Sequence, residues 1–113
     1  MEKKIEAITN KIEVLTKSLN RLNERMEGIR FIDFVRSCGS DVILLEKKIE
    51  ILTMVRNTLQ RNPTQDMFDK QYEFICRIAM NEVSFASGAF THSVDAVCNN
   101  AVKEVYDFLT CIK

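Results

Sequence analysis

The sequence has very little of what an all-β protein needs. Its 113 residues include three glycines and one proline, and β-rich domains of this size depend on many turns that use these two residue types. Hydrophobic residues make up 46% of the chain and charged residues 28%, a balance typical of globular rather than disordered proteins. The sequence therefore predicts an all-α protein built from a few long helices.

Long apolar runs are also missing. No stretch approaches the roughly 18 consecutive apolar residues that a membrane-spanning helix requires. The first six residues are mostly charged, so they lack the apolar core of a signal peptide. We therefore expect no membrane insertion, a cytoplasmic or nuclear location, and cysteines that stay as reduced, buried thiols.

Familiar catalytic and metal-binding patterns are absent as well. His92 is the only histidine, and no Cys-x-x-Cys pair occurs among the four cysteines, which are Cys38, Cys76, Cys98 and Cys111. A base–nucleophile pair of His92 and Cys98 would need a third, orienting group that the sequence does not offer. The cysteine separations do not match those of zinc ligands, and no Gly-rich phosphate loop is present. We predict no enzyme, no catalytic residues, no metal, no cofactor and no small-molecule substrate.

Helical periodicity is what the sequence has in abundance, above all in its first thirty residues. Apolar side chains recur there at alternating spacings of three and four, which defines a heptad seam of a and d positions. The seam consists of Ile5, Ile8, Ile12, Leu15, Leu19, Leu22, Met26 and Ile29. So narrow a stripe is more typical of a coiled coil than of a globular core face. We predict that these side chains bind a partner helix; packing only within the chain's own bundle is the alternative.

The positions beside the seam bear on the partner. Lys4, Lys11, Ser18 and Arg25 occupy g positions and Arg30 an e position, whereas the nearest glutamates lie at b. Two copies of the seam would bring together no attractive g–e ion pair, so a partner with acidic or neutral flanking residues suits better. We expect the partner to be another protein or a second copy of this chain. The candidate electrostatic contacts are Lys4, Lys11, Arg25 and Arg30. Each ion pair would stabilise the complex by about a few tenths of a kcal/mol, as exposed ion pairs do.

The rest of the chain is predicted to form a helical bundle. The apolar face changes after Ile29, so the first helix is expected to run to about residue 36 with a bend, and 37–41, which contains Gly39, to form a turn. Further helices are predicted at about 42–60, 63–86 and 93–112, with Asn62 as the cap of the third helix and Pro63 at its first position. The expected architecture is a coiled-coil helix over 1–36 followed by a three-helix bundle over 37–113.

Helix length supplies the main argument for a partner. About 33 helical residues in the first helix would reach about 50 Å, against about 30–36 Å for the later helices. Part of the apolar seam would then lack cover within the chain. The predicted function is a non-enzymatic protein-interaction or assembly subunit that oligomerises or docks on a partner through the seam.

A second interpretation is a helical regulatory protein that binds nucleic acid, such as a small viral factor. The Lys and Arg residues along the first helix could contact a phosphate backbone. The glutamates interspersed among them would repel phosphate, so protein binding is the preferred interpretation.

Overall fold

The chain folds into helices throughout the part that the structure describes. The computed structural model covers residues 1–26, 31–81 and 91–113, with side chains at 1–25, 39–80 and 96–113. Within these ranges it contains four α-helices and no strand: α1 (Glu2–Met26), α2 (Phe31–Arg61), α3 (Gln65–Asn81) and α4 (Thr91–Ile112). The prediction of an all-α fold of about four helices is confirmed.

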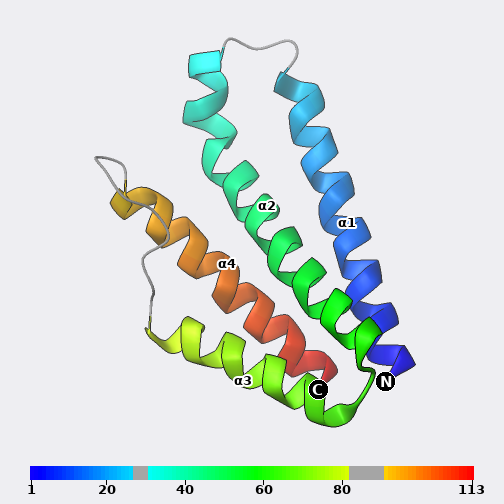
Figure 1. The fold of residues 1–113 in the computed structure, drawn as a ribbon. Helices are drawn as coiled ribbons and strands as arrows, with labels where there is room; N and C mark the ends of the chain where they lie inside the picture. Colours follow the sequence, from blue (N-terminus) through cyan, green and yellow to red (C-terminus); the bar gives the residue numbers. More distant parts are fainter. Residues whose placement is uncertain (27–30, 82–90) are drawn as a thin grey trace.

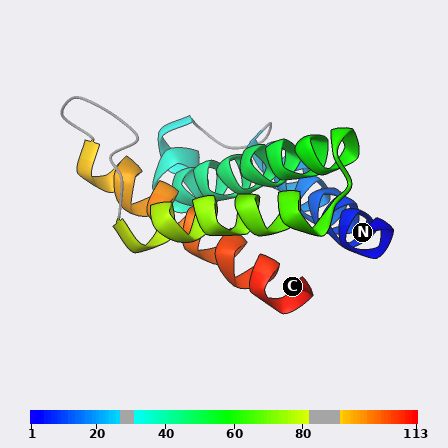
Figure 2. The same cartoon turned by 60° about the horizontal axis from the view of Figure 1, so that its bottom comes forward.

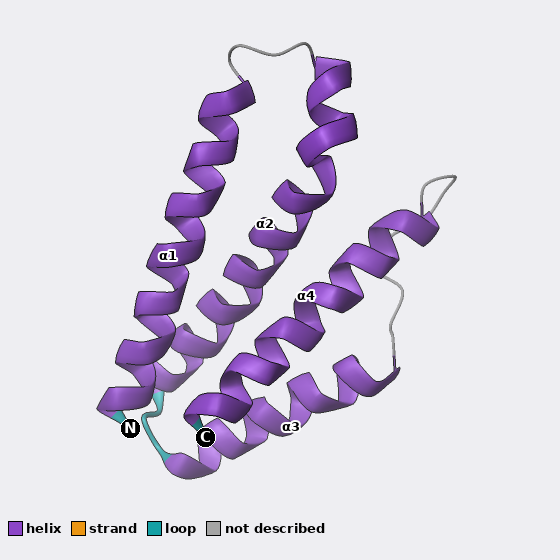
Figure 3. Cartoon of the chain, turned by 180° about the vertical axis from the view of Figure 1, so that it is seen from behind, coloured by secondary structure: helices purple, strands orange, loops and turns teal. Residues whose placement is uncertain are grey.

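The helices are arranged around α2. Helices α1 and α2 form a long antiparallel hairpin, and α4 packs against α2 beside it, while α3 packs mainly against α4 (Figure 1). Seen from behind, α4 leans away from α2 toward its Thr91 end (Figure 3). Both chain termini lie at the end of the molecule where α2 meets α3 (Figures 1 and 2). We call this the closed end, and the opposite end of the hairpin, near Met26 and Phe31, the open end.

One hydrophobic core joins all four helices near the closed end. Its fully buried side chains include Ile8 of α1, Leu52 and Leu59 of α2, Phe68 of α3 and Leu109 of α4. Burying such a side chain contributes roughly 1.5–3 kcal/mol relative to leaving it in water. Helix α1 is therefore part of the bundle and is not a separate rod.

The predicted turn at 37–41 is wrong, because these residues lie within α2. Helix α1 ends at Met26 and α2 begins at Phe31, so the predicted boundary between residues 36 and 37 falls inside a helix. The change of apolar face after Ile29 belongs to a second helix and not to a bend in the first. Gly39 costs a helix only about 1 kcal/mol relative to alanine, and packing along the rest of α2 outweighs so small a term.

The length argument for an overhanging first helix is also wrong. Helix α1 has 25 residues and α2 has 31. At about 1.5 Å per residue, α2 reaches roughly 46 Å, which matches the 47 Å long dimension of the molecule. Helix α1 therefore runs alongside a longer neighbour, and any free apolar surface on it must be found residue by residue.

The N-cap of α3 lies two residues after the expected one. Thr64, not Asn62, precedes the first helical residue, and the Thr64 hydroxyl accepts a hydrogen bond from the Met67 amide at 3.2 Å. This is the bond by which an N-cap satisfies an amide of the first turn. Pro63 therefore lies outside the helix, although the start signal in 62–65 was located correctly.

The burial of Ile8 predicts that part of the seam stabilises the lone chain. We expect Ile8→Ala to lower the free energy of unfolding by about 2–5 kcal/mol, because it removes buried methyl groups and leaves a cavity. Val14→Ala, on an exposed position of the same helix, should change it by no more than about 0.5 kcal/mol. Urea denaturation at several protein concentrations measures both effects. A loss for Ile8→Ala that varies with protein concentration would place Ile8 in an oligomer interface instead.

Candidate functional site

The seam predicted to bind a partner is divided between the core and the surface. Ile8, Ile12 and Leu15 are buried, with 0%, 9% and 5% of their surface exposed. Ile5 is half-buried and packs on the same core. Buried side chains have no surface to offer, so Ile8, Ile12 and Leu15 pack against the chain's own helices in this structure.

The seam is less covered toward the open end. Leu19 and Leu22 are half-buried, and the side chains of Met26 and Ile29 lie outside the described residues, as does Arg30. Among the described seam positions, Ile5 at the closed end and Leu19 and Leu22 toward the open end therefore retain solvent-accessible apolar surface.

Two of the predicted electrostatic residues are engaged within the chain. The Lys4 ammonium lies 4.8 Å from the centroid of the Phe68 ring on α3 and donates a hydrogen bond to Gln65 Oε1 at 2.7 Å. The Lys11 ammonium lies 5.7 Å from the centroid of the Phe108 ring on α4. Cation–π contacts of this kind are worth about 0.5–1 kcal/mol at exposed sites. Lys4 and Lys11 thus help to hold α1 against α3 and α4.

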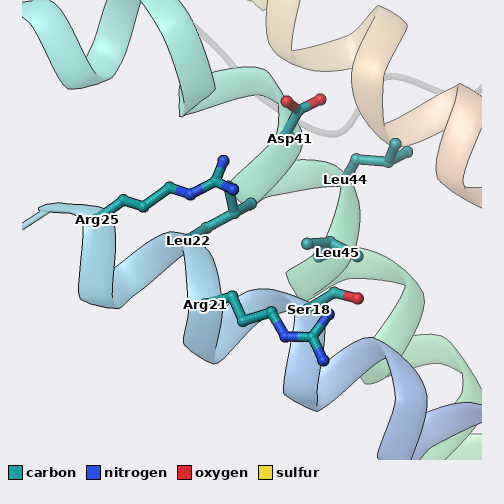
Figure 4. Close-up of a pocket in the computed structure, with 7 residues that line it drawn as sticks. All are labelled: Ser18, Arg21, Leu22, Arg25, Asp41, Leu44 and Leu45. Carbon is teal, nitrogen blue, oxygen red and sulfur yellow. The ribbon is translucent and has the colours of Figure 1, made fainter.

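A pocket of about 330 Å³ opens between α1 and α2 toward the open end. Its lining comes from two helices and consists of Ser18, Arg21, Leu22, Arg25, Asp41, Leu44 and Leu45. Figure 4 shows Leu22 and Leu45 between the helices, with Arg21 and Arg25 along the α1 edge and Asp41 on the α2 edge. We call this the hairpin pocket; it has an apolar floor and a mainly basic rim.

The two arginines of the rim have no partner among the described residues. Arg21 and Arg25 are exposed, and no hydrogen bond or ion pair joins either guanidinium to the described part of the chain. Lysines elsewhere do form ion pairs, such as Lys48 with Glu104 at 3.7 Å and Lys70 with Asp66 at 3.1 Å. The hairpin pocket therefore presents two guanidinium groups to solvent beside leucine side chains.

Sequence reasoning identified only part of this pocket. Leu22 and Arg25 were predicted protein contacts, and Arg21 was one of the first-helix cations considered for a phosphate backbone. The α2 residues Asp41, Leu44 and Leu45 were not predicted as contacts. Leu44 and Leu45 lie in the helix predicted over 42–60, and Asp41 lies in the segment 37–41 that was predicted to be a turn.

A second polar cluster joins α3 to the end of α4. The Tyr72 hydroxyl lies 2.9 Å from Thr110 Oγ1, and the Tyr72 and Tyr106 ring centroids are 5.3 Å apart. The Lys113 ammonium lies 4.5 Å from the centroid of the Tyr72 ring. Cys76 lies one turn after Tyr72 and, with it, lines a second pocket of about 320 Å³. This cluster was not predicted, although the i, i+4 spacings of Tyr72 with Cys76 and of Tyr106 with Thr110 place each pair on one helix face.

The two tyrosines of this cluster have oppositely shifted pKa values. Hydrogen bonding to Thr110, and then to Tyr106, lowers the pKa of Tyr72 from its ordinary value of 10.0. Hydrogen bonding to Tyr72, and then to Cys76, raises the pKa of Tyr106 to about 12. Each tyrosine is thus among the causes of the shift of the other, and the two pKa values move in opposite directions.

Cysteines and acidic residues form no cluster of metal ligands in the described residues. No three His, Cys, Asp or Glu side chains gather there as a metal site would require. Cys76, Cys98 and Cys111 are free thiols, of which only Cys98 is buried and Cys111 is exposed, so the expectation of uniformly buried thiols is wrong. The side chains of Cys38 and His92 lie outside the described residues, so the pairing of His92 with Cys98 does too.

Comparison with known proteins identifies no related protein. No protein-family model, no curated protein and no solved structure matches the chain. Among the described residues, no helix is long and apolar enough to cross a membrane. Any functional conclusion therefore rests on the geometry of the hairpin pocket and of the tyrosine cluster.

The tyrosine pair predicts an absorbance titration in two steps. The chain has two tyrosines and no tryptophan, so tyrosinate absorbance reports on Tyr72 and Tyr106 alone. We expect one ionisation below pH 10 and a second near pH 12. In Tyr72→Phe, the remaining pKa should fall from about 12 toward 10, because the main cause of its elevation is removed. A single transition near pH 10 for both residues would contradict the hydrogen-bonded pair.

Proposed function

We propose that this chain is a non-enzymatic protein-interaction subunit that docks a partner at the hairpin pocket. The proposal keeps the function expected from the heptad seam but confines it to the open end. Ile8, Ile12 and Leu15 serve the core, while Leu22 and the flanking arginines serve the partner.

The observation that supports the proposal is the combination of an apolar floor and unpaired cations. Leu22, Leu44 and Leu45 offer apolar surface whose burial is worth roughly 25 cal/mol per Å². Arg21 and Arg25 stand on the rim without an ion-pair partner among the described residues, and the carboxylate of Asp41 lies on the opposite edge of the pocket. Leucines ringed by arginine resemble the composition of protein interfaces, in which apolar centres and arginine are enriched.

Nucleic-acid binding by the first helix is less well supported. That interpretation uses a row of cations along α1, but the ammonium groups of Lys4 and Lys11 lie over aromatic rings of α3 and α4. The exposed Glu24 lies next to Arg25 in sequence, and its carboxylate would repel phosphate. An apolar floor also has no role in contacting a phosphate backbone.

Paired substitutions test the proposal. The first variant is Leu22→Asp, which places a charge on the floor of the pocket. The second is Arg21→Glu with Arg25→Glu, which alters exposed side chains and leaves the core untouched. Val14→Asp is the matched control, because Val14 lies on the same helix with 57% of its surface exposed and outside the pocket.

We expect both pocket variants, but not Val14→Asp, to lose the same binding partner in quantitative affinity purification from cells that express the chain. We expect at least a tenfold reduction in the recovered partner, which corresponds to about 1.4 kcal/mol. Circular dichroism checks that each variant is folded. If all three variants recover the same proteins in the same amounts, and the solution mass of each equals that of the wild type, the hairpin pocket is not a binding site.

A further inference from the structure

One row of residues along α1 places cations over aromatic rings of the neighbouring helices at a regular spacing. Lys4, Lys11, Ser18 and Arg25 are each seven residues apart, so successive members lie about 10.5 Å apart along the helix. At the closed end, Lys4 lies over Phe68 of α3 and Lys11 over Phe108 of α4. In both cases a cation of α1 covers an aromatic ring that a neighbouring helix brings beneath it.

Among the described residues, the same row meets no such ring at the open end. Helix α4 leans away from α2 toward Thr91, so it does not follow the hairpin to this end (Figures 1 and 3). Ser18 and Arg25 instead line the hairpin pocket, together with leucines of both helices. The pocket thus lies beside this row at the position where, nearer the closed end, an aromatic ring of α3 or α4 lies under the cation.

We propose that the occupant is an amphipathic helix of another protein that presents an aromatic side chain to Arg25 and a carboxylate to Arg21. This inference rests on the function proposed above and adds the chemistry of the partner. Arg21 and Arg25 are one helical turn apart, so the carboxylate and the aromatic residue lie three or four residues apart on the partner.

A helix suits this site because the groove between two antiparallel helices accepts a third by inserting side chains at i, i+3 and i+4 spacings. The charges of the rim determine which side of the bound helix carries the carboxylate. The carboxylate of the partner belongs on the α1 edge beside Arg21, while Asp41 on the α2 edge repels a second acid there (Figure 4). The partner therefore carries its acidic residue on one side of the aromatic residue only.

A second copy of this chain fits the pocket less well. Among the described side chains, Phe74 on α3 is the one aromatic residue that is exposed, with 49% of its surface accessible. Arg77 lies one turn after it and on the same helix face. Inserting Phe74 would bring the guanidinium of Arg77 toward Arg21 and Arg25, and like charges at an interface are unfavourable.

The test uses a phage-displayed library of one helical peptide framework, with the residues on one face randomised, selected against the full-length chain. We expect the enriched peptides to combine an aromatic residue with Asp or Glu three or four residues away. Their affinity should fall at least tenfold for Arg21→Glu and for Leu22→Asp. Lys17→Glu is the matched control, since it makes the same charge change on an exposed residue of α1 outside the pocket, and it should leave affinity within about twofold, a change of less than 0.5 kcal/mol on the scale of about 1.4 kcal/mol per tenfold.

Several results would overturn the inference. These are failure to enrich any peptide, enrichment without acidic residues, equal losses for Lys17→Glu and Arg21→Glu, or unchanged binding to Leu22→Asp. A dimer of the chain in sedimentation equilibrium that Leu22→Asp abolishes would make a second copy the occupant and would also overturn it. Each of these outcomes leaves the proposed function to its own test, because loss of a cellular partner from the pocket variants does not depend on the chemistry of that partner.

Discussion

The burial of Ile8, Ile12 and Leu15 against the chain's own helices is the constraint on which the rest of the structure depends. Once these side chains fill the core, α1 lies antiparallel to α2 and its orientation about its own axis is fixed. The heptad spacing then determines which residues lie beside the seam all along the helix. Lys4, Lys11 and Arg25 are spaced by multiples of seven residues and therefore lie on the same side of the seam. For this reason Lys4 and Lys11 lie over aromatic rings of α3 and α4, and Arg25 lines the hairpin pocket.

In the part of the chain that the structure describes, the two ends of the hairpin differ because α3 and α4 pack beside the closed end and not beside the open end (Figure 1). Near the closed end, α3 and α4 supply Phe68, Phe108 and the tyrosine cluster, so cations of α1 find partners inside the chain. Near the open end, the tilt of α4 leaves α1 and α2 to pack on each other. The consequence is an apolar groove whose arginines have no ion-pair partner among the described residues, and a binding role is proposed from this feature.

Part of this arrangement could be predicted from the sequence. The three–four spacing of apolar residues located α1 and its buried face, and the residues 62–65 located the start of α3. The spacing could not tell whether the helix that covers the seam belongs to this chain or to another, since Ile8 is buried equally well by either. The turn predicted at 37–41 was wrong because Gly39 is a turn signal on local grounds, and the packing of α2 outweighs that signal. The pocket was beyond sequence reasoning, because it depends on the direction in which α4 leans.

The division of α1 into a core half and an open half is most directly tested by amide hydrogen exchange of the native chain, resolved along the helix. Amides between residues 5 and 15 should exchange only through global unfolding, whereas those between 18 and 25 should exchange through smaller local openings and at least tenfold faster, a gap of about 1.4 kcal/mol. The protection of both halves should be independent of protein concentration. Uniform protection along the whole of α1 would contradict the account, because it would mean that the open end is as fully covered as the core.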